Sequence, residues 1–260
     1  MDPTDPSAVG LAASGVLVAL AVAISLWRHL DLERPMLWAS LRALVQLAVI
    51  GVALHLVVEP GRPMAWSWAW VAVMVVFAAW TVHRRAPEVP AAFALGVVAF
   101  GASALVSLSV LFGFGIFEAT NRTIVPLAGM VIGNSMAATV LVGRRIVDGL
   151  AVRREEVEAR LALGMPSQQA AAPYLREAVR TALIPQIETT KAVGIVFLPG
   201  AMVGLILAGA EPLGAVKVQL AVMYLILGSV ATSTTVVAIG LSHRLFTPDH
   251  RLVHLERARL

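Results

Sequence analysis

Seven long apolar runs follow one another along the chain, and they constrain the fold more than any other feature. A helix rises about 1.5 Å per residue, so about twenty residues cross the ~30 Å hydrocarbon core of a bilayer. The backbone must satisfy its own hydrogen bonds there, which makes each crossing segment helical. Only 14% of the residues are charged, against about 25% in soluble domains. The sequence therefore predicts an all-α integral membrane protein, a single domain over residues 1–260. Its seven transmembrane helices are expected at residues 9–27, 36–58, 64–82, 91–113, 123–142, 192–210 and 218–240.

Arginine is unevenly distributed between the loops of this layout, and the bias predicts the orientation. With the N-terminus outside, the cytoplasmic segments are 28–35, 83–90, 143–190 and the residues after Leu241, and they carry fifteen arginines. The external segments carry only Arg62 and Arg122. Because cytoplasmic loops are enriched in Lys and Arg, the chain is predicted to run N-out and C-in. The same rule accounts for the net charge of +4 without a nucleic-acid partner.

The longest polar stretch, residues 143–190, lies between the fifth and sixth apolar runs. Its pattern predicts a helix over Arg153–Leu163, ended by Gly164 and Pro166. A second helix is expected to begin with Ser167 as its cap and to close at Pro185. The sequence thus predicts a cytoplasmic amphipathic helical hairpin. We expect this hairpin to be a rigid element that a cytoplasmic partner moves or recognises. A helix lying flat on the membrane surface is the alternative.

Small residues recur at four-residue spacing in the two runs that flank this hairpin. The pairs Gly129 and Gly133, and Gly200 and Gly204, are the pattern that lets helix backbones approach closely in lipid. We expect helix packing at these glycines, which in its simplest form is ordinary packing without a functional role.

A transport pathway through the bilayer needs polar or polarisable groups within the spans. Asn134 is expected near the middle of the fifth span, where a buried amide must find partners. Arg42 and Gln46 lie one turn apart on the second span, and Arg42 could instead extend to the nearby interface. The methionines are common core filler, although thioethers also bind soft ions. The predicted pathway residues are Arg42, Gln46, Asn134, Ser135, Met202 and Gln219.

Several chemistries lack the residues they require. The sequence has no GxxxxGK[ST] phosphate loop and no cysteine, so it carries no nucleotide site or thiol nucleophile of its own. No Asp or Glu lies inside a predicted span, which argues against a carboxylate proton relay. Glu188 and Glu118, at opposite mouths of the spans, are the nearest candidates for a metal ligand. On these grounds the chain is expected to be non-enzymatic and to carry no cofactor of its own.

The tip of the hairpin resembles the EAAxxxG element of ABC importer permeases. The stretch EARLALG, residues 158–164, fits that pattern except for Arg160 at its second alanine. In that family this loop is the coupling helix that docks on an ATPase subunit. In the importers an Ile-x-Leu-Pro element closes the loop. In this sequence Pro185 lies about eight residues later than the proline of that element. The resemblance implies an ATPase contact through Glu158, Ala159, Leu161, Leu163, Gly164, Met165 and Pro166.

A longer resemblance covers the chain from the second run to Phe246. The blocks LRALVQL (41–47), VPLAGMVIGNSM (125–136), EARLALGMP (158–166) and KAVGIVFLPGAMVGLILAG (191–209) resemble the FetB-type permeases. That family includes bacterial iron-export permeases and plant aluminium-tolerance homologues. The resemblance implies a dimeric permease in the plasma (inner) membrane that exports iron or a related metal and serves metal homeostasis. A separate ABC ATPase would bind ATP and Mg. An organic cargo such as a nucleotide sugar, and a scaffold or sensor that recruits a partner without transport, stay open as alternatives.

Overall fold

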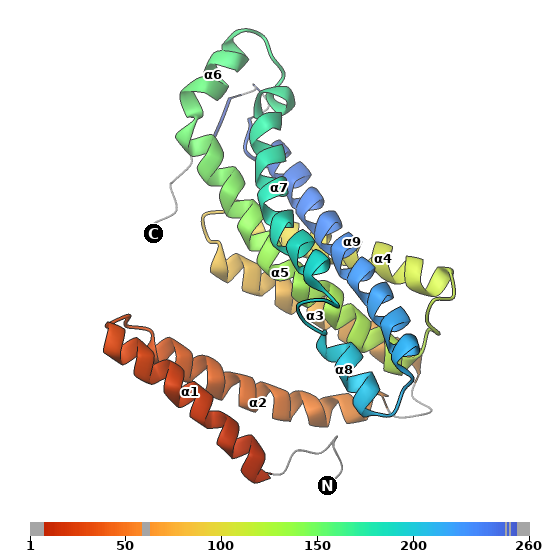
Figure 1. Cartoon of the computed structure of the whole chain (residues 1–260). Coiled ribbons are helices and arrows are strands. Elements are labelled where there is room, and N and C mark those ends of the chain that lie inside the picture. Colours follow the sequence, from red (N-terminus) through yellow and green to blue (C-terminus); the bar gives the residue numbers. More distant parts are fainter. Residues whose placement is uncertain (1–7, 59–62, 248, 250, 254–260) are drawn as a thin grey trace. The chain divides into compact units, whose positions relative to one another are not determined.

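The computed structural model describes residues 8–58, 63–247, 249 and 251–253, apart from the side chains of residues 8, 9, 11 and 52–58. These residues form nine helices and two isolated β-bridges, so the predicted all-α membrane fold is confirmed (Figure 1). The chain divides into two compact units. The first contains residues 1–62 and 200–215, and the second contains residues 63–199 and 216–260.

The first unit holds a pair of packed helices, α1 (Ala8–Arg28) and α2 (Glu33–Val58), together with the short helix α8 (Gly200–Leu207). The turn between α1 and α2 places His29 and Asp31 at positive φ angles of 52° and 55°. The hydroxyl of Ser25 donates to the carboxylate of Glu33 at 2.7 Å and accepts from the backbone N–H of Leu32 at 3.2 Å. These bonds fix the end of α1 to the start of α2.

The second unit is a bundle of long helices: α3 (Met64–Arg85), α4 (Ala92–Gly113), α5 (Asn121–Val152) and most of α9 (Pro212–Arg244). Among its described glycines, Gly96 is the one where an added Cβ would meet another backbone, at 3.0 Å from the Cα of Ala79. Buried serines add polar links, because Ser103 donates to the carbonyl of Ser229 at 3.0 Å. A glycine at the crossing and a few hydroxyl contacts are the usual means of packing helices in lipid.

Four of the seven predicted spans correspond to described helices that are long and apolar enough to cross a membrane, namely α3, α4, α5 and α9. The helix α1 contributes a shorter apolar segment, Ala12–Arg28, and α2 occupies the second predicted position. The sixth prediction, one helix over residues 192–210, is wrong. The chain leaves the helix after Ala192, turns with Gly194 at φ 85°, and forms a helix again only over the eight residues of α8. Eight residues span about 12 Å, less than the bilayer core.

The predicted hairpin is present, but it is continuous with the membrane bundle. The helix α5 runs unbroken through Gly143 to Val152, and α6 (Arg154–Ala162) follows at once. The helix α7 (Ser167–Ala192) then continues through Pro185, where the sequence predicted an end. A proline removes one backbone hydrogen bond, and the packing of α7 against α5 keeps the helix intact. Ser167 is the first residue of α7 rather than its cap, which is Pro166.

Candidate functional site

The structure forms a distinct head at one end of the second unit, made of residues 144–182, 245–247, 249 and 251–253. Its core lies between α5 and α7, where Ile146 and Leu150 face Ala170 and Ala171 at zero exposure. Val157 of α6 is also fully buried in this cluster. Because this core is closely filled, the head is a rigid extension of the bundle rather than a loose loop.

The tip of the head is the turn between α6 and α7, and it contains the predicted coupling residues. Gly164 has a φ of 85°, and its N–H donates to the carbonyl of Leu161 at 2.9 Å. The N–H of Met165 donates to the carbonyl of Arg160 at 3.1 Å. These two bonds are the Schellman arrangement that ends a helix at a glycine. The prediction that Gly164 ends this helix is therefore confirmed.

The turn divides the predicted coupling residues into exposed and supporting positions. The side chain of Leu163 is 88% exposed and that of Met165 is 39% exposed. Leu161 packs instead against the core of the head. Glu158, Ala159 and Pro166 are exposed. The tip thus presents an apolar side chain to its surroundings while a neighbouring leucine holds α6 in place.

Ion pairs along α6 stiffen the tip. Arg154 pairs with Glu158, and Arg160 pairs with Glu156, each at 2.7 Å and four residues apart. A second guanidinium nitrogen of Arg160 reaches the carbonyl of Ala170 on α7 at 3.3 Å. Exposed pairs of this spacing contribute about 0.3–0.5 kcal/mol each to a helix. Their main effect here is to fix the orientation of a nine-residue helix.

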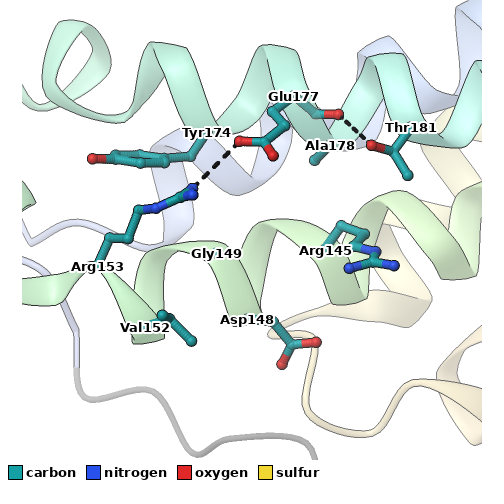
Figure 2. A pocket seen from close by; sticks show the side chains of 9 residues that line it. All are labelled: Arg145, Asp148, Gly149, Val152, Arg153, Tyr174, Glu177, Ala178 and Thr181. Carbon is teal, nitrogen blue, oxygen red and sulfur yellow. Dashed lines mark hydrogen bonds and ion pairs between the residues drawn. The ribbon is translucent and has the colours of Figure 1, made fainter.

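The ring of Tyr174 of α7 contacts two arginines, Arg153 just before α6 and Arg160 in its last turn. Its ring centroid is 5.4 Å from the guanidinium carbon of Arg153 and 5.5 Å from that of Arg160. Arg153 also pairs with Glu177 at 3.3 Å, as the dashed line in Figure 2 shows. Burial raises the pKa of the Tyr174 hydroxyl, and the nearby carboxylate of Glu156 adds to the shift. These contacts clamp the start of α6 to α7.

A cavity of about 240 Å³ opens beside this clamp, between α5 and α7. Arg145 and Asp148 line it from α5, and Glu177 and Thr181 line it from α7 (Figure 2). Charges of both signs meet here, and the carboxylate of Glu177 is already paired. The cavity is a polar recess in the head.

The segment after α9 ties the head to the last helix of the bundle. The guanidinium of Arg154 donates to the carbonyls of Leu252 and Val253 at 3.0 and 3.3 Å. The N–H of Val253 donates to the carbonyl of Leu245, at the end of α9, at 2.9 Å. Leu252 itself is buried in the core of the head. A movement of α6 is therefore linked to α9 as well as to α5 and α7.

Three predicted pathway residues lie in the second unit. Asn134 is exposed on α5, and its amide donates to the carbonyl of Met130 at 2.8 Å. Ser135, one residue later, is fully buried and lies 3.4 Å from the hydroxyl of Ser229 on α9. Gln219 is 4% exposed, and its side-chain oxygen is buried without a hydrogen-bond partner among the described residues.

The other three pathway residues lie in the first unit. Arg42 and Gln46 are exposed on α2, and Met202 is half-buried in α8. The predicted set thus divides between the two units. Within the second unit, the described contacts bring Ser135 to α9.

The glycines predicted to pack closely meet no neighbouring backbone among the described residues of their own unit. A Cβ added at Gly133, Gly200 or Gly204 would meet nothing within 4 Å, and one at Gly129 would meet only the end of Met74 at 3.6 Å. Close approaches occur instead at glycines the sequence did not single out. Gly96 meets Ala79, and Gly143 meets Val89 at 3.1 Å.

The two candidate metal ligands lie apart from other carboxylates. Glu188 pairs with Lys191 at 2.9 Å on the surface of α7, and Glu118 is exposed before α5. In the part of the chain that the structure describes, no three His, Asp or Glu side chains come close enough together to hold a metal ion.

Some features of the head are visible in the sequence and others are not. The spacing of Arg154 and Glu158, and of Glu156 and Arg160, predicts their ion pairs. The contacts of Tyr174 and of the segment after α9 join residues far apart in the chain, and no local sequence pattern predicts them.

Comparison with known proteins gives the family. Residues 8–246 match the family described as "Uncharacterised protein family (UPF0014)". The chain is 34% identical over 248 residues to the "Probable iron export permease protein FetB" of Escherichia coli, covering 94% of this chain and 93% of the relative. It is 37% identical over 222 residues to the "UPF0014 membrane protein STAR2" of rice, covering 85% and 78%.

A further relative is the "Protein ALUMINUM SENSITIVE 3" of Arabidopsis thaliana, 33% identical over 223 residues, with 86% of this chain and 81% of the relative covered. No solved structure matches the chain. The chain therefore belongs to the UPF0014 family of membrane proteins, and its relatives include the FetB-type permease that its sequence resembles.

Proposed function

We propose that this chain is the membrane-spanning permease subunit of an ATP-driven ABC exporter. A separate ATPase docks on the tip of the head, binds ATP and Mg, and drives export of iron or a related metal. The cargo is taken from the relative named as an iron export permease. The chain itself carries no phosphate loop, so the energy enters through the contact with the ATPase.

The exposure of Leu163 is the observation that carries this proposal. Its side chain is 88% exposed at the tip of a head whose core is fully buried. A rigid helix end with an apolar anchor and a charged surround has the composition of an interface hot spot with its polar rim. The neighbouring acidic and basic side chains of α6 are held in ion pairs. Their positions are therefore already fixed before a partner binds.

Seven crossings, with the N-terminus outside, complete the proposed topology. The 32 residues of α5 extend about 48 Å, roughly 18 Å more than the bilayer core. The excess carries Arg144 and Arg145, which supports our assignment of the head to the arginine-rich, cytoplasmic side. In this arrangement the sixth crossing is discontinuous and includes residues 193–199 and α8. Non-helical backbone is tolerated at membrane depth where it lines a cavity, so this segment is assigned to the pathway.

A homodimer fits the exposed face of α5. Gly133, Asn134 and Ala137 are all exposed on this helix, although the middle of a span should not offer an amide to lipid. Small residues also allow a second helix to approach closely. We assign this face to the second copy or to the pathway between the copies.

The charge of the predicted pathway favours a second candidate cargo. Arg42 is the ionised residue among the six pathway candidates, and an arginine attracts anions rather than bare cations. A metal chelate or an organic anion such as a nucleotide sugar would suit it. The two cargo classes are separated by offering free metals and their anionic chelates to the same vesicles.

The test is co-purification followed by reconstitution. The full chain is expected to retain an ATPase whose turnover in vesicles rises with cargo, and Leu163→Ala is expected to abolish the retention. Stable recruitment of a partner that lacks a nucleotide site would instead support a scaffold or sensor and refute the permease assignment.

A further inference from the structure

A groove of about 540 Å³ runs between α7 and α9 on the second unit. Its apolar wall is formed by Leu175, Val179, Leu183 and Ile187 of α7 with Ala238 and Ile239 of α9. Ile239 is 56% exposed and Ile187 is 38% exposed. The volume falls within the range of small-molecule sites, about 300–1,000 Å³, so the groove holds more than an isolated side chain.

Two arginines line this groove together with the apolar residues of α7. Arg176 and Arg180 line it from α7, four residues apart on one face of the helix. No acidic residue lines the groove. Neither guanidinium has a hydrogen-bond or ion-pair partner among the described residues, whereas Arg144, Arg153, Arg154 and Arg160 are each paired with a carboxylate. The groove therefore presents two uncompensated positive charges above an apolar wall.

The order of these residues along α7 matches the depth profile of one leaflet. From the head inward the groove is lined on α7 by Ala172, Leu175, Arg176, Val179, Arg180, Leu183 and Ile187, so both arginines lie on the head side of Leu183 and Ile187. The twelve residues from Arg176 to Ile187 extend about 16 Å, close to half of the ~30 Å hydrocarbon core. On α9 the groove reaches Ser242, beside His243 and Arg244 at the polar end of that helix. In a bilayer the two arginines therefore lie at the membrane surface, and Leu183 and Ile187 lie within the hydrocarbon.

We propose that this groove binds an anionic phospholipid from the leaflet on the side of the head. The phosphate is held by Arg176 and Arg180, and an acyl chain lies along Leu183, Ile187 and Ile239. Basic pockets between membrane helices recognise anionic headgroups in this way. A bound lipid would fill the space between α7 and α9 and hold α7 at a fixed distance from α9. The inference requires only that the chain is embedded in a membrane, and it does not depend on ATP-driven transport.

The test uses the purified full chain in detergent, titrated with fluorescent phosphatidylglycerol or phosphatidylcholine. We expect phosphatidylglycerol to bind more tightly. Each of Arg176→Gln and Arg180→Gln should weaken phosphatidylglycerol binding about fivefold, because a basic residue near an anionic surface contributes about that factor. The double variant should lose about 25-fold by the same reasoning, and phosphatidylcholine binding should be unchanged.

Arg145→Gln is the matched control, since Arg145 lies at the same end of the bundle and lines the other cavity. It should leave lipid affinity unchanged. Thr235→Trp, which fills the groove from α9, should block both lipids while the oligomeric state stays the same. Equal binding of the two lipids, or an equal loss in Arg145→Gln and Arg180→Gln, would overturn the proposal. Conversion of the Thr235→Trp variant to a smaller oligomer would also overturn it, because the groove would then be an interface between copies.

Discussion

Truncation of Leu163 to alanine separates docking from folding more cleanly than any other change in the head. The side chain is 88% exposed, so its loss creates no cavity and should change the free energy of unfolding by no more than about 0.5 kcal/mol. On an ATPase surface the same side chain would be buried, and burial of a leucine contributes about 1.5–3 kcal/mol. Leu163→Ala should therefore weaken docking by about 2 kcal/mol, which is roughly a 30-fold increase in Kd.

The assay compares two leucines that lie two residues apart. Binding of the co-purified ATPase to the detergent-solubilised chain is titrated by calorimetry, and thermal unfolding is followed in parallel. Leu161 packs against the core of the head, so Leu161→Ala should lower the melting temperature, while Leu163→Ala should leave it in place and lower affinity. If Leu163→Ala binds the ATPase as tightly as the native chain does, the tip is not the docking element and the reasoning fails.

Three further predictions concern the packing of the chain. Gly96→Ala should destabilise it by about 1–3 kcal/mol, because the added methyl lies 3.0 Å from the Cα of Ala79, whereas Gly101→Ala on the same helix meets nothing and should be neutral in thermal unfolding. Gly164→Ala should cost about 1 kcal/mol through its positive φ alone; Gly164→Asn, which tolerates this region better, should cost less in the same measurement. Because the pKa of Tyr174 is raised in the folded state, its neutral hydroxyl contributes to stability. This contribution is complete at pH values below the pKa of the unfolded chain, which is near 10. That stability is lost as pH rises through the folded pKa, so Tyr174→Phe should reduce the alkaline loss in a pH-dependent denaturation series.

Local patterns predicted the helices well because length and apolarity decide a helix in lipid almost alone. The predicted ranges for α3, α4, α5 and α9 agree with the structure within a few residues at most ends. The failure at residues 192–210 has a physical cause that hydropathy does not register. Gly194 and Pro199 interrupt the helix, yet every intervening side chain is apolar, so the run reads as one span. Pro185 had the opposite effect, because packing outweighed the bond it removed.

Around the candidate site, the sequence predicted the structure only where the contacts are local. The end of α6 at Gly164 follows from a glycine before a proline two residues later. The support of the tip depends instead on pairs separated by long stretches of chain, such as Arg154 with Leu252. The glycines show the same limit. Spacing identified Gly133, but whether a backbone comes close to it depends on a neighbouring helix, and the approach was found at Gly96.

The contacts of the head also indicate how a push on its tip would travel. The helix α5 is continuous from the bundle to Val152, so it transmits displacement along its axis. Arg154 passes the same displacement to the end of α9 through the carbonyls of Leu252 and Val253. Rigid transmission along α7 stops at Ala192, where the helix gives way to a turn with Gly194 at positive φ. We infer that a partner docked at Leu163, as proposed, would move α5 and α9 together.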